Sequence, residues 1–102
     1  MTIIVGSATI HPELRTEALA LAIEHSVRSR AEPGCIAHNC HNDAEDSTRI
    51  VFVEESTDMA AVKVHFAVPA LGEFVRRIGV MAVGAPVMRV YSARDVTATA
   101  RE

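Results

Sequence analysis

Residues 50–54 constrain the fold more strongly than any other part of this 102-residue chain. The segment is rich in β-branched and aromatic residues, which favours a β-strand. In a strand, Ile50 and Phe52 would point to one face and Val51 and Val53 to the other. Because both faces are apolar, we expect the strand to be covered on both sides.

A short helix is predicted directly after this strand. Ser56, Thr57 and Asp58 carry oxygens that can accept hydrogen bonds from the free N–H groups of a first helical turn. Apolar residues then recur at helical spacing, at Met59, Val62 and Phe66. The pattern therefore places a carboxylate, Glu54, and an imidazole, His65, at the two ends of an otherwise apolar segment.

Composition predicts one globular domain over residues 1–102, with a small polar tail at residues 95–102. The net charge of −3 comes from interspersed charges and leaves no basic stripe, which argues against nucleic acid and against an anionic membrane surface as partners. No apolar run approaches the roughly 20 residues of a membrane span, and the first residues do not resemble a secretory signal. We expect a cytoplasmic protein.

The order of predicted elements is typical of an α+β, ferredoxin-like fold with a split βαβ arrangement and an antiparallel sheet. The elements are a strand over 2–10, a helix from 12 to about 30, a Pro-Gly turn at 33–34, strands over 35–42 and from 50, a short helix, a helix from 69 that stops at Gly79, and a strand over 87–93. One layer of helices covers one face of the sheet. A second copy of the chain is then expected on the other face, as a homodimer and a dimeric α+β barrel.

Three polar positions have structural interpretations. Cys35 and Cys40 are an odd number of residues apart on one strand, so we expect opposite faces and two free thiols. His25 lies on the buried stripe of the first helix and is interpreted as a hydrogen-bonded core residue without chemistry.

The segment from His38 to His41 is the candidate metal site in the sequence. His38 and Cys40 share one strand face and His41 lies on the other, so one chain could offer two of these three ligands at most. We therefore predict no metal there. A site with four ligands would need two chains meeting through the face of His38 and Cys40.

Two stretches resemble the antibiotic biosynthesis monooxygenase domain of the dimeric α+β barrel superfamily. The first is Glu32-Pro33-Gly34-Cys35 after the first helix, and the second is Glu54-x-Ser56-x-Asp58-x-x-Ala61-x-x-x-His65. The likeness extends over nearly the whole chain. The family often has an aromatic residue where this chain has Ser56, and many members have a second histidine where this chain has Pro69 and Ala70.

The resemblance implies oxygenation of a phenol, anthrone or hydroquinone by O2, without a flavin, haem or metal cofactor. Such chemistry needs a dry pocket and a base that deprotonates the substrate. His65 is the candidate base or hydrogen-bond partner of the substrate oxygen, and Glu54 is expected to fix its tautomer. The candidate walls of the substrate pocket are Phe52, Phe66, Phe74 and Tyr91.

Two other interpretations stay open. Glu54 and His65 could form a structural clamp, and the four aromatic residues could simply pack in the core. The whole chain would then be a non-catalytic dimeric barrel that binds a small apolar ligand or a protein partner.

Overall fold

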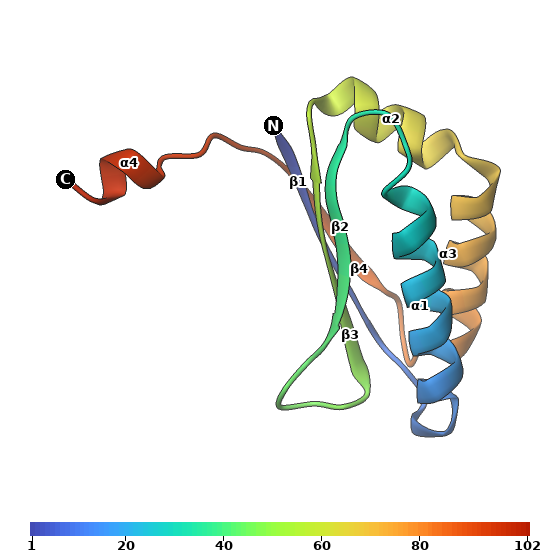
Figure 1. Cartoon of the computed structure of the whole chain (residues 1–102). Helices are drawn as coiled ribbons and strands as arrows, with labels where there is room; N and C mark the ends of the chain where they lie inside the picture. Colours follow the sequence, from blue (N-terminus) through green and yellow to red (C-terminus); the bar gives the residue numbers. More distant parts are fainter.

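Four antiparallel strands form one sheet, and helices α1, α2 and α3 lie on one side of it (Figure 1). The computed structural model describes residues 1–102. The elements are β1 (Thr2–Thr9), η1 (Pro12–Leu14), α1 (Arg15–Ser29), β2 (Cys35–Asn42), β3 (Arg49–Ser56), α2 (Met59–Ala67), α3 (Pro69–Met81), β4 (Val87–Ser92) and α4 (Thr97–Ala100). The strand order is β2-β3-β1-β4. The predicted α+β, ferredoxin-like fold is confirmed.

The two central strands bury one face against the helices. Along β1 burial alternates residue by residue, with Ile4 and Ala8 buried and Val5 exposed. Ile50 and Phe52 of β3 face the same way and join the core. The buried core also includes Ile10, Ala18, Leu21, Ala22, Phe74, Ile78 and Met81.

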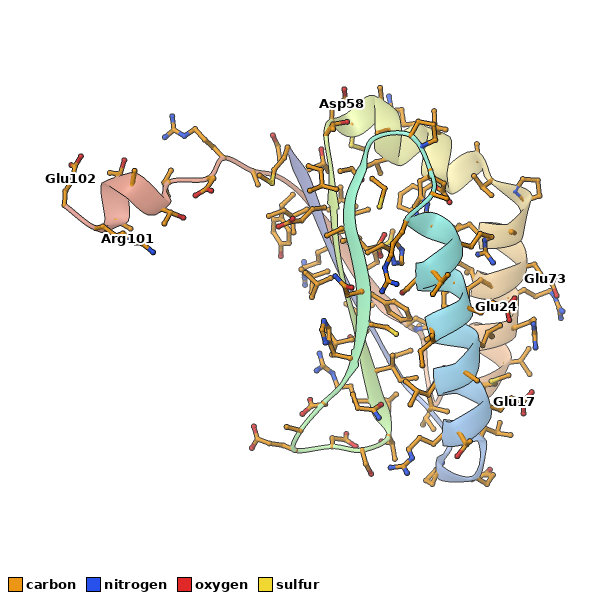
Figure 2. The ribbon with its side chains drawn as sticks, viewed as in Figure 1. Glu17, Glu24, Asp58, Glu73, Arg101 and Glu102 are labelled. Carbon is orange, nitrogen blue, oxygen red and sulfur yellow. The ribbon has the colours of Figure 1, made fainter.

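The helical layer presents its charged side to solvent. Glu17, Glu24 and Glu73 lie on α1 and α3 in Figure 2, and all three are exposed. Helix α3 continues to Met81, so the predicted stop at Gly79 is wrong by two residues. Met81 is buried in the core, and burial of this last turn outweighs the weak helix preference of glycine.

The Pro-Gly turn ties the start of β2 to the start of α2. Gly34 has a φ of +80°, as a type II turn requires, and the Cys35 N–H closes the turn on the Glu32 carbonyl oxygen at 3.2 Å. The Thr57 N–H donates to the Gly34 carbonyl oxygen at 2.9 Å. Asp58 then caps α2 by accepting from the Ala61 N–H at 2.8 Å, as predicted.

An irregularity at the start of β2 changes the expected position of the cysteines. The register of β2 against β3 shifts between Cys35 and Ala37, as in a β-bulge. Cys35 therefore lies beside His38, and Cys40 packs against the core, so both face the helices and the prediction of opposite faces is wrong. The thiols are nevertheless free, as predicted.

The other face of the sheet carries apolar side chains that no helix covers. Its apolar residues are Ile3, Val5, Val51, Val53, Val87 and Tyr91. Beyond β4 the chain runs away from the body of the domain on this same side and ends in α4 (Figure 1). None of the helices has the length and apolar character needed to cross a bilayer.

Candidate active site

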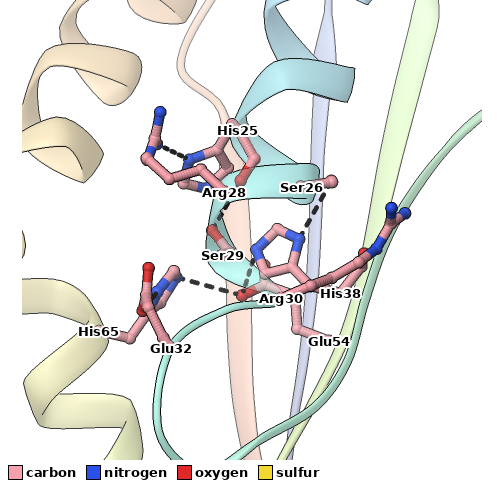
Figure 3. A network of polar contacts seen from close by, with 9 residues as sticks. All are labelled: His25, Ser26, Arg28, Ser29, Arg30, Glu32, His38, Glu54 and His65. Carbon is pink, nitrogen blue, oxygen red and sulfur yellow. Dashed lines mark hydrogen bonds and ion pairs between the residues drawn. The ribbon is translucent and has the colours of Figure 1, made fainter.

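The Glu54 carboxylate lies between two buried histidines (Figure 3). Its Oε1 atom is 3.1 Å from His38 Nε2 and 3.5 Å from His65 Nε2. Glu54 stands near the end of β3, His38 in the middle of β2 and His65 in the last turn of α2. The predicted meeting of Glu54 with His65 is thus present in the structure, and His38 is an additional member.

The outer nitrogen of each of these histidines has its own partner. His65 Nδ1 is 2.6 Å from Glu32 Oε1, and His38 Nδ1 is 3.1 Å from the Ser26 hydroxyl. The contact with Glu32 is shorter than that with Glu54, which makes Glu32 the better candidate for fixing the His65 tautomer. His38 Nε2 contacts the Glu54 carboxylate as an ion pair but does not form a hydrogen bond with it.

His25 completes a cluster of three histidines. Its ring stacks on Phe74 at a centroid distance of 3.9 Å and lies 5.0 Å from the His38 ring and 5.8 Å from the His65 ring. The Arg28 guanidinium donates to His25 Nδ1 at 2.5 Å. The prediction of a buried, hydrogen-bonded core histidine is confirmed.

Glu54, His65 and His25 reach the wall of a cavity of about 380 Å³ between the sheet and α3. Nine of its fifteen lining residues are hydrophobic. They are Gly6, Ser7, Ala8, His25, Phe52, Glu54, His65, Phe66, Leu71, Phe74, Val75, Ile78, Pro86, Val87 and Met88. Cavities of this size and character are typical of small-molecule sites.

Three of the four aromatic residues predicted as pocket walls line this cavity: Phe52, Phe66 and Phe74. The fourth, Tyr91, does not. It pairs with Ile3 in the sheet and is 49% exposed on the face opposite the helices. The register of β4 against β1 decides to which face of the sheet Tyr91 points, and the sequence does not specify that register.

Neighbouring groups shift the pKa values of the cluster in different directions. Burial alone would raise the pKa of Glu54, but the close contacts of the carboxylate with His38 and His65 outweigh burial and lower the pKa to about 2. Burial lowers the pKa of His25 to about 3, helped by the charges of His38, Arg28 and His65. For His65, burial is outweighed by Glu54 and Glu32, and the pKa is raised above 6.5.

The three residues that the sequence analysis considered as metal ligands, His38, Cys40 and His41, do not face one common site. His41 is exposed, whereas His38 and Cys40 face the chain's own helices. A four-ligand site between two chains through that face is therefore wrong, because α1 already covers it. Burial raises the pKa of the Cys35 thiol, with Glu32 and Glu54 adding to the effect.

The family model for antibiotic biosynthesis monooxygenase matches residues 1–77. The chain belongs to this family. A curated relative, the uncharacterized protein sll1783 of Synechocystis sp., is 31% identical over 75 residues, which are 74% of this chain and 51% of that protein. The chain thus spans about half the length of the curated relative it matches.

Solved structures share the fold over nearly the whole chain. A crystal structure of an antibiotic biosynthesis monooxygenase is 27% identical, with a TM-score of 0.85 over 93% of this chain and 100% of that one. Rv0793 from Mycobacterium tuberculosis is 19% identical, with a TM-score of 0.86 over 94% and 97%. A Deinococcus radiodurans protein is also 19% identical, with a TM-score of 0.89 over 94% and 95%. The two likenesses at 19% support the fold alone.

The sequence analysis did not place three neighbours of the Glu54 and His65 pair in the site, namely His25, Glu32 and His38. His38 and Glu32 lie in segments that the sequence analysis examined for other reasons, and His25 was assigned to the core. The sequence held only a weak indication that these residues belong to the site. His25 and His38 fall at inward-facing positions of α1 and β2, and Glu32 lies in the turn next to α2. Their convergence depends on how α1, β2 and α2 pack.

Proposed function

We propose that this chain is a monooxygenase that uses O2 to oxidise a small phenol, anthrone or hydroquinone in the cavity beside Glu54 and His65. The observation that carries the proposal is the placement of a paired carboxylate and imidazole on the wall of a largely apolar cavity. Phe52, Phe66 and Phe74 offer aromatic surface to a planar substrate. Membership of the family supports the same reaction class.

The proposed role of His65 is to accept the proton that the substrate loses. A deprotonated phenol or anthrone is electron-rich and can transfer electrons to O2. For an anthrone methylene, one oxygen atom becomes the new carbonyl oxygen, and the other leaves as water with the two methylene hydrogens. The substrate supplies all the electrons, so the reaction balances without a further reductant.

Glu32 and Glu54 are the positioning residues for this base. They face the two ring nitrogens of His65 and raise its pKa, which strengthens the neutral imidazole as a base. An imidazolium formed during the reaction would be stabilised by both carboxylates.

Replacing His65 tests the proposal. His65→Ala removes the base and should lower the rate of oxygen uptake with a responsive quinol by about 10²–10⁴. Glu54→Gln keeps the volume of the side chain and should cost less. The double variant should be no slower than His65→Ala, because a missing base cannot be oriented. Oxygen uptake and thermal unfolding would be measured on all four proteins.

A structural role predicts a different outcome. If Glu54 and His65 are a clamp, both substitutions lower the melting temperature and leave turnover per folded molecule unchanged. A folded His65→Ala protein that oxidises a quinol at the wild-type rate would contradict the catalytic assignment.

One observation favours the second candidate function, a non-catalytic protein that binds a small apolar ligand. Both ring nitrogens of His65 face carboxylates of the chain itself, as expected of a structural network. A binding protein would retain a hydroquinone without consuming oxygen. The same measurement of oxygen uptake therefore distinguishes the two functions.

We also propose that the domain acts as a homodimer through the open face of the sheet, which is defined as the face carrying Ile3, Val5, Val51, Val53, Val87 and Tyr91. Val5 and Val53 are paired neighbours at its centre, and each is 39% exposed in the single chain. A second copy offers an identical apolar face, which a two-fold axis would bring into register.

A further inference from the structure

We propose that His38, His65 and Glu54 form a binding site for one divalent transition-metal ion. This inference goes beyond the proposed oxidation chemistry. It rests on the convergence of three side chains from β2, α2 and β3 (Figure 3). No local sequence motif predicts that these three side chains meet.

The two separations from the Glu54 carboxylate are close to those between neighbouring ligands of one ion. Nitrogen and oxygen ligands lie about 2.0–2.2 Å from such a metal, so neighbouring ligand atoms are roughly 3.0–3.4 Å apart. Glu54 Oε1 is 3.1 Å from His38 Nε2 and 3.5 Å from His65 Nε2. Ligand nitrogens of His38 and His65 lie within 4.8 Å of each other, so the two imidazoles would move closer together to share an ion.

The nitrogens directed at Glu54 are those left free by the surrounding hydrogen bonds. Metal-binding histidines use one ring nitrogen for the ion and the other for an outer partner. Here Glu32 holds His65 Nδ1 and Ser26 holds His38 Nδ1. His38 is 2% exposed, and its buried Nε2 faces the Glu54 carboxylate at 3.1 Å without forming a hydrogen bond, so this polar atom is directed into the site.

The donor set indicates the class of ion. Two imidazoles and one carboxylate suit Zn²⁺, Fe²⁺, Co²⁺ or Mn²⁺, and are too few oxygens for Ca²⁺. His25 lies near, since ligand atoms of the three histidines all fall within 4.8 Å of one another. We leave His25 outside the ligand set because the Arg28 guanidinium can only donate to its Nδ1, which places the proton of the neutral ring on Nε2 and leaves no free lone pair for an ion. Since His65 and Glu54 also line the cavity, the remaining coordination positions would face it.

The metal site and the proposed base use the same atom. A metal on His65 Nε2 takes the lone pair that would accept a substrate proton, so one molecule cannot do both. The two proposals therefore have separate tests. Oxygen uptake by chelator-treated protein tests the oxidation, and metal binding tests the site.

Titration of the full chain with Co²⁺, after removal of metals with a chelator, tests the inference. Co²⁺ bound to nitrogen and oxygen ligands absorbs visible light, and we expect one ion per wild-type chain. His38→Ala and Glu54→Gln should lose this absorption. Glu32→Gln, which alters an outer partner, should weaken binding by about 10–100-fold. His41→Ala is the matched control: it removes an exposed histidine of the same strand and should bind as the wild type does.

Wild-type protein that binds no Co²⁺, or binding that survives in both His38→Ala and Glu54→Gln, would overturn the inference. Circular dichroism establishes that each variant is folded. X-ray absorption of the Co²⁺-loaded wild type gives a test that needs no variant, because two imidazole ligands produce a characteristic multiple-scattering pattern. A first shell without imidazole would also refute the site.

Discussion

Burial has opposite outcomes for two imidazoles of the same cluster. His25 stacks on Phe74 and has Arg28 as its polar neighbour, so burial keeps it neutral and its pKa falls to about 3. His65 is buried as well, but Glu54 and Glu32 face it, and its pKa rises above 6.5. The charge of the partner, more than depth in the protein, decides which imidazole can carry a proton.

Acid should destabilise the metal-free protein through His25. Below pH 6.5 the unfolded chain binds a proton at His25, and the folded chain does not until about pH 3, so stability falls as pH falls through this window. Between pH 6.5 and 5 the loss would be up to about 2 kcal/mol. Glu54 adds a further loss between 4.5 and about 2. The free energy of unfolding in urea at pH 7 and at pH 5 measures the loss through His25.

The control for this prediction is His25→Phe, which keeps an aromatic ring against Phe74. It should lose less stability between pH 7 and 5 than the wild type does. His65 works in the opposite direction: its raised pKa contributes stability that is fully present below 6.5 and is lost as pH rises through the folded pKa. Equal losses in both proteins would show that His25 does not titrate as described.

At the scale of elements, the turn between α1 and β2 positions one side of the site. Glu32 stands just before this turn, and its carboxylate reaches His65 on α2. The Gly34 backbone lies so close to α2 that an added Cβ would be 2.6 Å from the Ala61 Cβ and 2.9 Å from the Thr57 hydroxyl oxygen. The turn and the helix can approach this closely because residue 34 has no side chain.

Gly34→Ala should therefore destabilise the domain by about 2–4 kcal/mol. About 1–2 kcal/mol comes from placing a Cβ at positive φ, and the rest from contact with α2. Chemical denaturation measures the loss. Where the variant still folds, the contact between Glu32 and His65 should lengthen as the turn moves away.

Gly84→Ala separates the two contributions. Gly84 has a φ of +77°, close to that of Gly34, but an added Cβ there meets nothing within 4 Å. The Gly84→Ala variant should therefore lose only the stability that comes from placing a Cβ at positive φ. A loss as large as that of Gly34→Ala would mean that the contact with α2 contributes nothing.

At the scale of the whole molecule, the open face of the sheet explains why both central strands are apolar on both sides. The helices cover Ile4 and Phe52, whereas Val5 and Val53 remain exposed in the single chain. The tail beyond β4 leaves the domain on the same side (Figure 1). A partner chain against this face would bury the valines and could contact the tail.

Charging the centre of the open face should separate the proposed dimer. We expect sedimentation equilibrium of the wild type to give twice the 11.0 kDa of one chain, and Val53→Lys to shift the protein to monomer or to unfold it. Val27→Lys is the control, because Val27 is 55% exposed on α1, away from the open face. A wild-type mass of 11.0 kDa at micromolar concentration would contradict the dimer.

The sequence by itself determined the elements, the fold class and one pair in the site. The β-branched and apolar residues of β1 and β3, the Pro-Gly turn and the Asp58 cap are local patterns, in which each residue's neighbours along the chain set its conformation. The pairing of Glu54 with His65 followed from a family motif that spans two adjacent elements.

The tertiary structure decided what depends on packing between distant segments. The bulge in β2 set the face of Cys35, and the register of β4 turned Tyr91 away from the cavity. The packing of α1 on β2 and of the turn on α2 brought the side chains of His25, His38 and Glu32 to His65. These positions lie up to forty residues apart in sequence, and only the folded chain, through the burial of its apolar core, brings them together.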